Sequence, residues 1–231
     1  IDIEKCSSLA KKLSTKSNKV LLLIDNTFMG PIWSNPIKLG ADIVLYSVTK
    51  YLGGHSDIVS GAALGKKAYI DRIKSSRVFL GNIASPFTSW LLLRSLETLK
   101  IRMEKEAQNA LKVANFLNKH PKVEKVNYLG LISKSNKQYS LYKKQYGSGG
   151  AMITIYIKGN LNKAYKFLDN LKLIKLAVSL GGTESLACHP GTMTHVDVNE
   201  KTKKRIGITD SLVRLSISLE NPDDLINDIK D

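Results

Sequence analysis

The chain has 231 residues, of which 43% are hydrophobic and 24% are charged. This composition is that of an ordinary globular protein and excludes a disordered, collagen-like or coiled-coil chain. The 35 Lys and Arg against 20 Asp and Glu give a net charge of +15, so nucleic acid and other anionic partners have to be weighed. No apolar run approaches the roughly 20 residues of a membrane-spanning helix, so no membrane partner is expected.

The positive charge is spread along the chain rather than gathered on one segment. Residues 20–63 carry three acidic and two basic side chains, and residues 196–231 carry eight acidic and six basic ones. The excess of Lys lies elsewhere and forms no Arg-rich or aromatic-interleaved run. A protein that reads nucleic acid concentrates its basic residues on an element that reaches base edges, so we expect a solvated surface and no specific nucleic-acid partner.

The first 83 residues predict one helix followed by short apolar strands. The helix is expected over about 2–16 and the strands over 20–24, 43–46 and 58–64. Uninterrupted apolar strands are typical of an α/β sheet that is covered on both faces. The spacing leaves little room for a helix between the second and third strands.

A long helix is predicted from Ser85-Pro86, a favourable N-cap and first-turn pair, to about residue 119. Its leucines would bury one face, while its charged side chains, Arg102 and Glu106 among them, stay largely in water. Beyond it, strands alternate with helices and indicate a smaller α+β domain. The strands are expected over 123–127, 151–157 and 212–218, the helices over about 160–171 and 223–229, and the two domains over residues 1–83 and 84–231.

Side chains that carry chemistry follow the first two strands. Asp25 ends the first strand, and Ser47, Thr49 and Lys50 follow the second. Because strand ends converge on the ligand crevice of an open α/β sheet, Asp25 and Lys50 could face one pocket. A partly desolvated lysine is a usable nucleophile toward carbonyls, and the hydroxyls suit an anionic oxygen.

Pyridoxal phosphate requires this set of groups: an imine-forming lysine, donors for the phosphate and a carboxylate for the ring nitrogen. The residues alone leave a second interpretation open, in which Lys50 caps a surface strand and Asp25 begins a turn.

Separate motifs in chain order resemble the Cys/Met-metabolism family of pyridoxal-phosphate enzymes, which includes cystathionine lyases and synthases, methionine gamma-lyase and homoserine sulfhydrylases. The motifs are DNTF and GADIVLYSVTKYLGGHSD within residues 25–57, SLETLKIRMEK at 95–105, and SLGGTESLACHPGTMTH and GITDSLVRLSISLE within 179–220. The resemblance implies a type I aminotransferase-like fold. Residues 1–83 would then be the end of the large cofactor domain, with a mostly parallel sheet, and the remainder an α+β C-terminal domain.

The resemblance also implies individual roles. Lys50 matches the catalytic lysine that carries the cofactor, Asp25 the acid at the pyridine nitrogen, and Ser47 and Thr49 the hydroxyls on the cofactor phosphate.

Arg214 matches the arginine that clamps the substrate carboxylate, and Ser179 a residue beside that carboxylate. A planar guanidinium binds a carboxylate through two parallel hydrogen bonds, which suits this role. Without the family, an ion-paired strand arginine is the simpler interpretation. No metal site is expected, because His189 and His195 have no carboxylate at ligand spacing.

The implied reaction is the loss of a sulfur leaving group from a small sulfur amino acid, with Lys50 moving protons at the substrate. Cystathionine-handling relatives often have Glu before the serine of the SLGG segment, where this chain has Val178. An unpaired ammonium in a dry pocket is costly, so an apolar residue suits a small thioether. We therefore expect gamma-elimination on methionine, giving a 2-oxo acid, ammonia and a thiol. The alternatives are cystathionine gamma-lyase or gamma-synthase, and O-acylhomoserine sulfhydrylase.

By resemblance, the protein is expected to be a cytoplasmic homo-oligomer, a dimer of dimers. Its two cysteines, Cys6 and Cys188, form no close pair, which favours a reducing compartment. The family's chains carry an N-terminal part, with a Gly-containing loop and a tyrosine for the cofactor, that this sequence lacks. A truncated chain is therefore expected. An inactive fragment or a basic-surface binding protein is the alternative to an enzyme.

Overall fold

The computed structural model describes residues 1–230. Segments distant in the sequence pack into two units, the first formed by residues 1–99 and 134–147 and the second by residues 100–133 and 148–231. Asp231, the last residue of the second predicted domain, lies outside the described residues. The domain boundary predicted between residues 83 and 84 stays a prediction. Within residues 1–230, no helix combines the length and the apolar character needed to cross a membrane.

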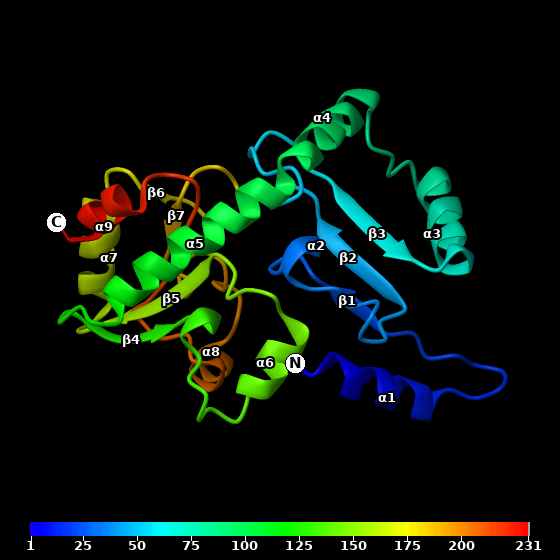
Figure 1. Ribbon diagram of the computed structural model, residues 1–231, viewed down its shortest axis with the longest axis horizontal. Helices are drawn as coiled ribbons and strands as arrows, with labels where there is room; N and C mark the ends of the chain where they lie inside the picture. The colour runs from blue at the N-terminus through cyan, green and yellow to red at the C-terminus, as the bar shows by residue number, and fades with distance from the viewer. Residues whose placement is uncertain (231) are drawn as a thin grey trace. The chain divides into compact units, whose positions relative to one another are not determined.

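The first unit is built on a three-stranded sheet in the order β1-β2-β3, with α3 beside β3 (Figure 1). β1 and β2 pair in parallel, β2 and β3 pair antiparallel, and no helix lies between β2 and β3, as predicted. The elements are α1 (Ile3–Leu13), β1 (Leu23–Asp25), α2 (Gly30–Trp33), β2 (Ile43–Ser47), β3 (Gly61–Gly65), α3 (Lys67–Leu80), α4 (Pro86–Glu97) and α6 (Tyr139–Gln145).

The two faces of this sheet have different surroundings. On one face, Val44, Tyr46 and Val48 pack with Leu52 and Ile58 into a core. On the other face the strands border an open hollow, and Leu23 in β1 is 50% exposed. Residues of α3 border the same hollow. The expectation of a covered sheet is confirmed for the core face and stays a prediction for the other face. Side chains alternate between faces along a strand, so only half of each apolar run enters the core.

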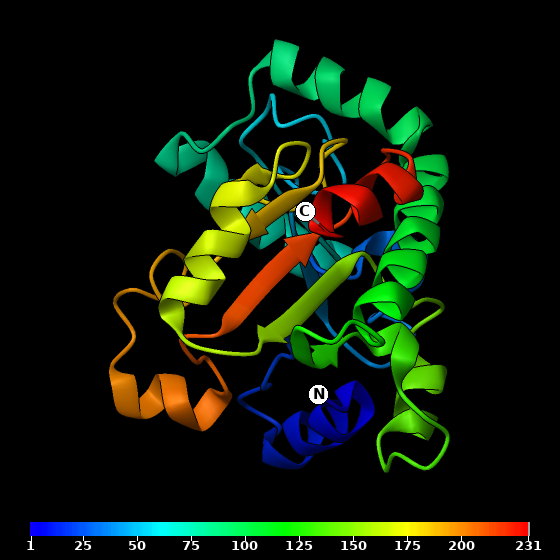
Figure 2. The same cartoon turned by 90° about the vertical axis from the view of Figure 1, so that its left-hand side faces the viewer.

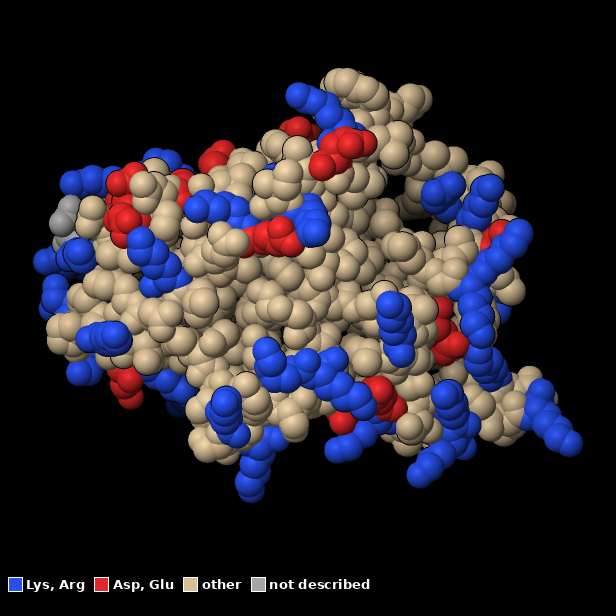
Figure 3. All heavy atoms as spheres, in the orientation of Figure 1, with Lys and Arg blue, Asp and Glu red and all other residues tan. Residues whose placement is uncertain are grey.

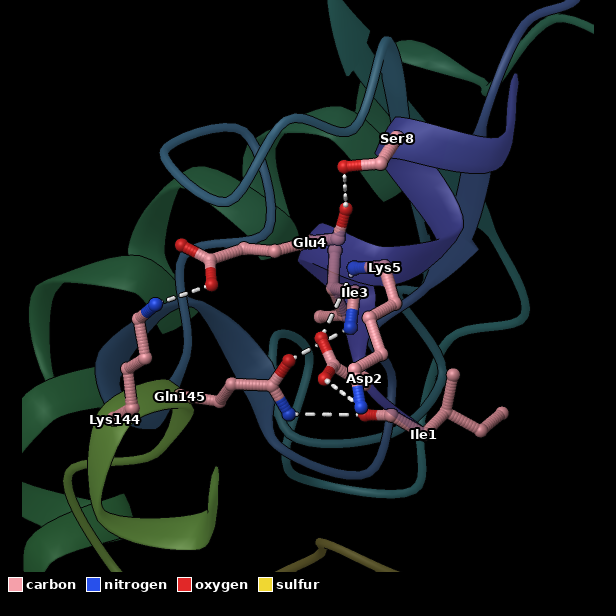
Figure 4. A network of polar contacts seen from close by, with 8 residues as sticks. All are labelled: Ile1, Asp2, Ile3, Glu4, Lys5, Ser8, Lys144 and Gln145. Atoms are coloured by element: carbon pink, nitrogen blue, oxygen red, sulfur yellow. Dashed lines mark hydrogen bonds and ion pairs between the residues drawn. The ribbon is translucent and has the colours of Figure 1, made fainter. Parts of the chain in front are cut away.

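Polar contacts fasten α6 to the start of α1 (Figure 4). Gln145 Oε1 accepts the main-chain N–H of Ile3 (2.8 Å), and Gln145 Nε2 donates to the main-chain oxygen of Ile1 (2.9 Å). Lys144 forms an ion pair with Glu4. Because the first N–H groups of a helix have no partner within it, the buried Gln145 side chain satisfies a group that α1 cannot. These contacts explain why residues 134–147 belong to the first unit.

The second unit is built on a five-stranded sheet in the order β4-β5-β8-β7-β6, with α7 and α9 over one face (Figure 2). Its pairings are antiparallel except that between β6 and β7. The elements are α5 (Leu99–Leu117), β4 (Val123–Asn127), η1 (Leu129–Leu131), β5 (Met152–Ile157), α7 (Leu161–Asn170), β6 (Lys175–Leu176), β7 (Leu186–Cys188), α8 (Glu200–Ile206), β8 (Leu212–Ser216) and α9 (Pro222–Lys230).

The single long helix predicted over residues 85–119 is two helices, α4 and α5, separated at Thr98. The backbone of Thr98 leaves helical geometry at φ −104° and ψ 0°. Its Oγ1 and its N–H both bond to the main-chain oxygen of Ser95, each at 3.3 Å. A threonine side chain that bonds to nearby backbone competes with the helical ladder, which accounts for the break. The predicted N-cap is confirmed, since Ser85 Oγ accepts the N–H of Thr88 (3.1 Å).

Two charged side chains that were expected in water, Arg102 and Glu106, are buried. They are 4% and 0% exposed, whereas the apolar Ile101 is 70% exposed. Helical spacing shows which residues share a face, but packing against the sheet decides which face is buried. Among residues 1–230 neither carboxyl oxygen of Glu106 has a hydrogen-bond partner. Burial raises the pKa of Glu106 to about 8, although the nearby Arg102 acts in the opposite direction.

We expect Glu106 to make the free energy of unfolding fall as the pH rises from its usual pKa of 4.5 to about 8. In this window the folded state binds more protons than the unfolded state, so stability is lost by up to about 1.4 kcal/mol per pH unit. Glu106→Gln removes the titrating group, and urea unfolding across this range should show a flatter pH dependence. Glu104→Gln, on an exposed side chain of α5, is the control. An equal slope in parent and Glu106→Gln would contradict this role.

Candidate functional site

Asp25 and the end of β2 lie at the same edge of the first unit's sheet. The parallel register places Asp25 opposite Leu45, and the N–H of Asn26 continues the ladder to the oxygen of Leu45 (2.9 Å). Ser47 lies two residues beyond Leu45, so it shares a face with Asp25. Both side chains line the open hollow on the face away from the core. Lys50, which was expected to face one pocket with Asp25, is absent from the lining of this hollow, as is Thr49. That expectation stays a prediction.

The turn after β1 is tied to β2 by two side chains that sequence reasoning passed over. Thr27 donates its N–H to Asp25 Oδ1 (2.9 Å), and Thr27 Oγ1 accepts the N–H of Ser47 (2.8 Å). The buried Asn26 amide donates to Tyr46 Oη (3.2 Å) and to the main-chain oxygens of Gly30 (2.8 Å) and Ser34 (3.3 Å). The signal was in the DNT motif itself, which sets three polar residues directly after an apolar strand. These bonds hold Asp25 beside Ser47.

Thr49 and Lys50 lie in the turn that follows β2. Thr49 Oγ1 accepts the N–H of Ser60 (3.1 Å) and donates to the oxygen of the same residue (3.4 Å), so this hydroxyl is engaged by the main chain. The N–H of Lys50 donates to the oxygen of Ser47 (3.2 Å), which closes the turn and leaves Lys50 half-buried. Gly53 is required nearby, because a Cβ there would lie 2.8 Å from the oxygen of Val48.

Arg214 and Ser179 come together in the second unit. Arg214 lies on β8, and its Nη2 donates to the main-chain oxygens of Val178 (2.7 Å) and Ser179 (3.2 Å). A guanidinium carries five N–H donors, so others are left for an anion. The cross-strand neighbour Cys188 is buried, and burial raises the pKa of its thiol despite the opposing effect of Arg214. Complete burial and a raised thiol pKa suit a packing residue rather than a nucleophile.

Side chains just beyond Arg214 hold the loop that carries Ser179. Ser216 Oγ accepts the N–H of Gly181 (3.1 Å), and Ser218 Oγ donates to the oxygen of Gly182. Further along the same stretch, the Glu220 carboxylate accepts both the N–H (2.6 Å) and the hydroxyl (2.7 Å) of Ser185. Sequence reasoning missed this arrangement. Its signal is the alternation of polar residues after Arg214 in RLSISLE.

The structure thus gathers the predicted site residues in two sets. Asp25, Ser47, Thr49 and Lys50 lie at the strand ends of the first unit, and Ser179 and Arg214 lie in the second. A carboxylate, two hydroxyls and an amine at one sheet edge fit the ring nitrogen, phosphate and aldehyde of pyridoxal phosphate, with Ser47 the less engaged hydroxyl. In the described part of the chain, no group of three or more His, Cys, Asp or Glu could hold a metal ion.

Thr27→Val should destabilise the first unit by about 1–3 kcal/mol, because it keeps the side-chain shape but leaves the N–H of Ser47 without its acceptor. Thr27→Ser retains the acceptor and serves as the control. Urea unfolding measures both variants. Equal unfolding midpoints for Thr27→Val and Thr27→Ser would show that the bond between Thr27 and Ser47 contributes nothing.

Comparison with known proteins adds a family and a fold. The model of the family described as "Cys/Met metabolism PLP-dependent enzyme" matches residues 1–231. The cystathionine gamma-lyase of Dictyostelium discoideum is 45% identical over 214 residues, which are 92% of this chain and 55% of that protein. The L-methionine gamma-lyase of Fusobacterium nucleatum subsp. polymorphum is 43% identical over 232 residues, 100% of this chain and 57% of that protein.

Among solved structures, cystathionine gamma-lyase from Lactobacillus plantarum complexed with L-serine matches with a TM-score of 0.90 and 38% identity, over 99% of this chain and 58% of that one. The cystathionine gamma-lyase CalE6 of Micromonospora echinospora matches with a TM-score of 0.92 and 32% identity, over 100% and 59%. These matches confirm the predicted α/β, type I aminotransferase-like fold. The chain spans a little over half the length of these two curated relatives.

Proposed function

This chain belongs to the family of pyridoxal-phosphate-dependent enzymes of Cys/Met metabolism, and we propose that it forms part of a C–S lyase that acts on a small sulfur-containing amino acid. One observation carries the proposal. Asp25 and Ser47 line one hollow at the ends of β1 and β2, and Lys50 follows in the next turn. The relatives named cystathionine gamma-lyase and L-methionine gamma-lyase support the same reaction class.

When bound, pyridoxal phosphate supplies an electron sink that stabilises negative charge at the substrate α-carbon. Ser47 would hold its phosphate with its hydroxyl, and Thr49 would join it by turning its O–H away from the main-chain oxygen of Ser60. Asp25 would hold the proton on its ring nitrogen. Lys50 would anchor its aldehyde carbon through Nζ. As a half-buried amine, Lys50 Nζ is also suited to take the α-carbon proton of the substrate and return it during turnover.

Arg214 would orient the substrate by its carboxylate. The bonds from Nη2 to the oxygens of Val178 and Ser179 fix the plane of the guanidinium. A fixed guanidinium can bind a carboxylate through two parallel hydrogen bonds, which sets the position of the substrate α-carbon. Ser216 and Ser218 support this arrangement, because they hold the loop that begins at Ser179.

Methionine is the substrate that the residues favour. Val178 is 52% exposed beside Ser179 and offers no charge to the distal ammonium of cystathionine. Burying that ammonium without a partner would be costly, whereas a thioether needs none. Sequence identity does not separate the two, since relatives of both names match at 45% and 43%. Cystathionine is therefore the second candidate.

The working state that we propose is a cytoplasmic homo-oligomer. Phe87, Trp90 and Leu93 on α4 are exposed large apolar side chains, as is expected of a surface that pairs with another copy. Cys6 and Cys188 form no disulfide, which suits a reducing compartment.

Reconstitution of the purified chain with pyridoxal phosphate tests the cofactor site. We expect a yellow absorbance band that borohydride abolishes, with the reduced label mapped to Lys50, because only an imine with that amine gives both results. Lys50→Ala should lose the band and the label, whereas Lys38→Ala, an exposed lysine of the same unit, should keep them. A parent chain that shows no band would contradict the proposal for this chain.

Arg214→Ala should keep the yellow band and lose affinity for L-methionine by about tenfold or more, because a hydrogen-bonded charge pair contributes roughly 1.5–3 kcal/mol. The substrate concentration needed to perturb the band measures this affinity. Arg214→Lys, which keeps the charge but not the planar fork, should fall between parent and Arg214→Ala. Loss of the band in Arg214→Ala would overturn the carboxylate role. The same titration with L-cystathionine and O-acetyl-L-homoserine decides between the substrates.

A further inference from the structure

A cavity of about 540 Å³ lies within the second unit, bordered by the C-terminal end of α5, strands β4 and β5, and helices α7 and α9. This volume is within the range of small-molecule sites. Its floor is apolar and buried, formed by Leu117, Ile155 and Ile229. The six residues of the proposed active site are absent from its lining, so it is a separate feature of the fold.

The rim of this cavity is strongly positive. At the end of the second unit that carries α7 and α9, on the left in Figure 3, Lys and Arg side chains lie with Asp and Glu side chains among them. Ion pairs within residues 1–230 involve other lysines, so the rim charges are not neutralised there. The lysines that line the cavity are Lys122, Lys158, Lys163, Lys166 and Lys230.

The acidic residue that lines the cavity, Asp228, is already engaged. Its carboxylate accepts the main-chain N–H groups of Lys172 (2.8 Å), Leu173 (3.1 Å) and Ile174 (2.9 Å). Burial acts to raise the pKa of Asp228, but these three donors outweigh burial and hold the pKa below its usual value. The carboxylate therefore stabilises the loop before β6 and stays ionised, so that its single negative charge offsets one of the five lysine charges around the cavity.

The residue types of the rim indicate which anion it suits. Its cations are lysines, whose ammonium groups act as point charges. A phosphate, with close to two negative charges, gains more from several such charges than a carboxylate with one. The rings of His120 and Phe167 border the same cavity beside the apolar floor. Such walls suit an apolar or aromatic body.

We propose that this cavity binds a small organic phosphate, with the phosphate among the rim lysines and an apolar or aromatic body on the floor. The class of ligand follows from the combination of lysines, apolar floor and aromatic walls in one cavity. This site does not depend on the proposed lyase activity, because it shares no residue with it.

Phenyl phosphate is the probe, and the ring NMR signals of His120 report on this cavity alone once they are assigned with His120→Gln. We expect these signals to shift saturably when phenyl phosphate is added to the purified chain. Inorganic phosphate and phenol, the two halves of the probe, should each bind at least about tenfold more weakly, since each forgoes one part of the site.

Matched variants test the geometry. Replacing Lys163 and Lys166 together by Ala should weaken phenyl phosphate by about tenfold, because two rim charges are lost. Lys201→Ala, on an exposed lysine of α8 outside the cavity, should leave the affinity unchanged. Asn170→Trp changes no charge and should abolish binding by filling the cavity, with far-UV circular dichroism confirming that the variant folds.

Any of these results would overturn the proposal: no saturable shift of the His120 signals, equal affinity for inorganic phosphate and phenyl phosphate, unchanged affinity in the double lysine variant, or the same loss in Lys201→Ala. Tighter binding of a single-stranded oligonucleotide to the same His120 signals would also overturn it, because the rim would then belong to a polyanion surface. If Asn170→Trp does not fold, comparison of the Lys163 and Lys166 double variant with Lys201→Ala still tests whether the cavity binds phenyl phosphate.

Discussion

The parallel pairing of β1 with β2 is the constraint on which the candidate active site depends. It places Asp25 opposite Leu45, so that Asp25 and Ser47 share the face that borders the hollow. A slip of one residue would turn one of the two side chains into the core on the other face. Two interactions stabilise this register. Val44 and Tyr46 pack into the apolar core, and the side chains of Asn26 and Thr27 form hydrogen bonds to β2 at the strand ends.

Buried polar groups give this pairing its specificity. Asn26 is 5% exposed. Its side-chain amide donates hydrogen bonds to the main-chain oxygens of Gly30 and Ser34 and to the hydroxyl of Tyr46. A buried network is stabilising when every member has a partner and costly when one is missing. The turn after β1 therefore has one favourable arrangement, and the position of Asp25 is set by its bond from Thr27 together with the bonds of its neighbour Asn26.

The second unit uses a strand in a similar way. β8 carries Arg214, and the serines that follow at every second position reach the loop from Ser179 to Gly182. Strand alternation keeps these polar groups on one face, while Val213 and Leu215 enter the core from the other. The same stretch of chain, β8 and the residues after it, thus carries the Arg214 guanidinium and holds the loop to which that guanidinium bonds. Such a fixed guanidinium can present its N–H donors to a carboxylate in one orientation.

The fold changes how the net charge of +15 is distributed over the surface. Arg102 is withdrawn from the surface beside Glu106, and five lysines converge on the rim of one cavity. The charge is therefore concentrated in part by the fold, through lysines on α7, on α9, directly after β5 and in the turn after α5, which are far apart in the chain. No single run in the sequence carries it.

The sequence determined the features that depend on local periodicity and on residue chemistry. Strands β2, β4, β5 and β8 and helices α1, α7 and α9 follow from apolar spacing over a few residues, and the chemistry of Asp25 and Lys50 was recognisable from their place after apolar strands. α3 was not predicted, and none of its side chains is buried. The catalytic and binding roles of the site residues stay predictions.

Only the tertiary structure decided the break at Thr98, the burial of Arg102 and Glu106, the supporting bonds of Asn26 and Ser216, and the lysine-rimmed cavity. Each depends on which distant segment packs against a residue. Helix or strand periodicity shows which residues share a face of the element. Whether that face is buried depends on the segment that packs against it, because that segment sets the free energy of burial.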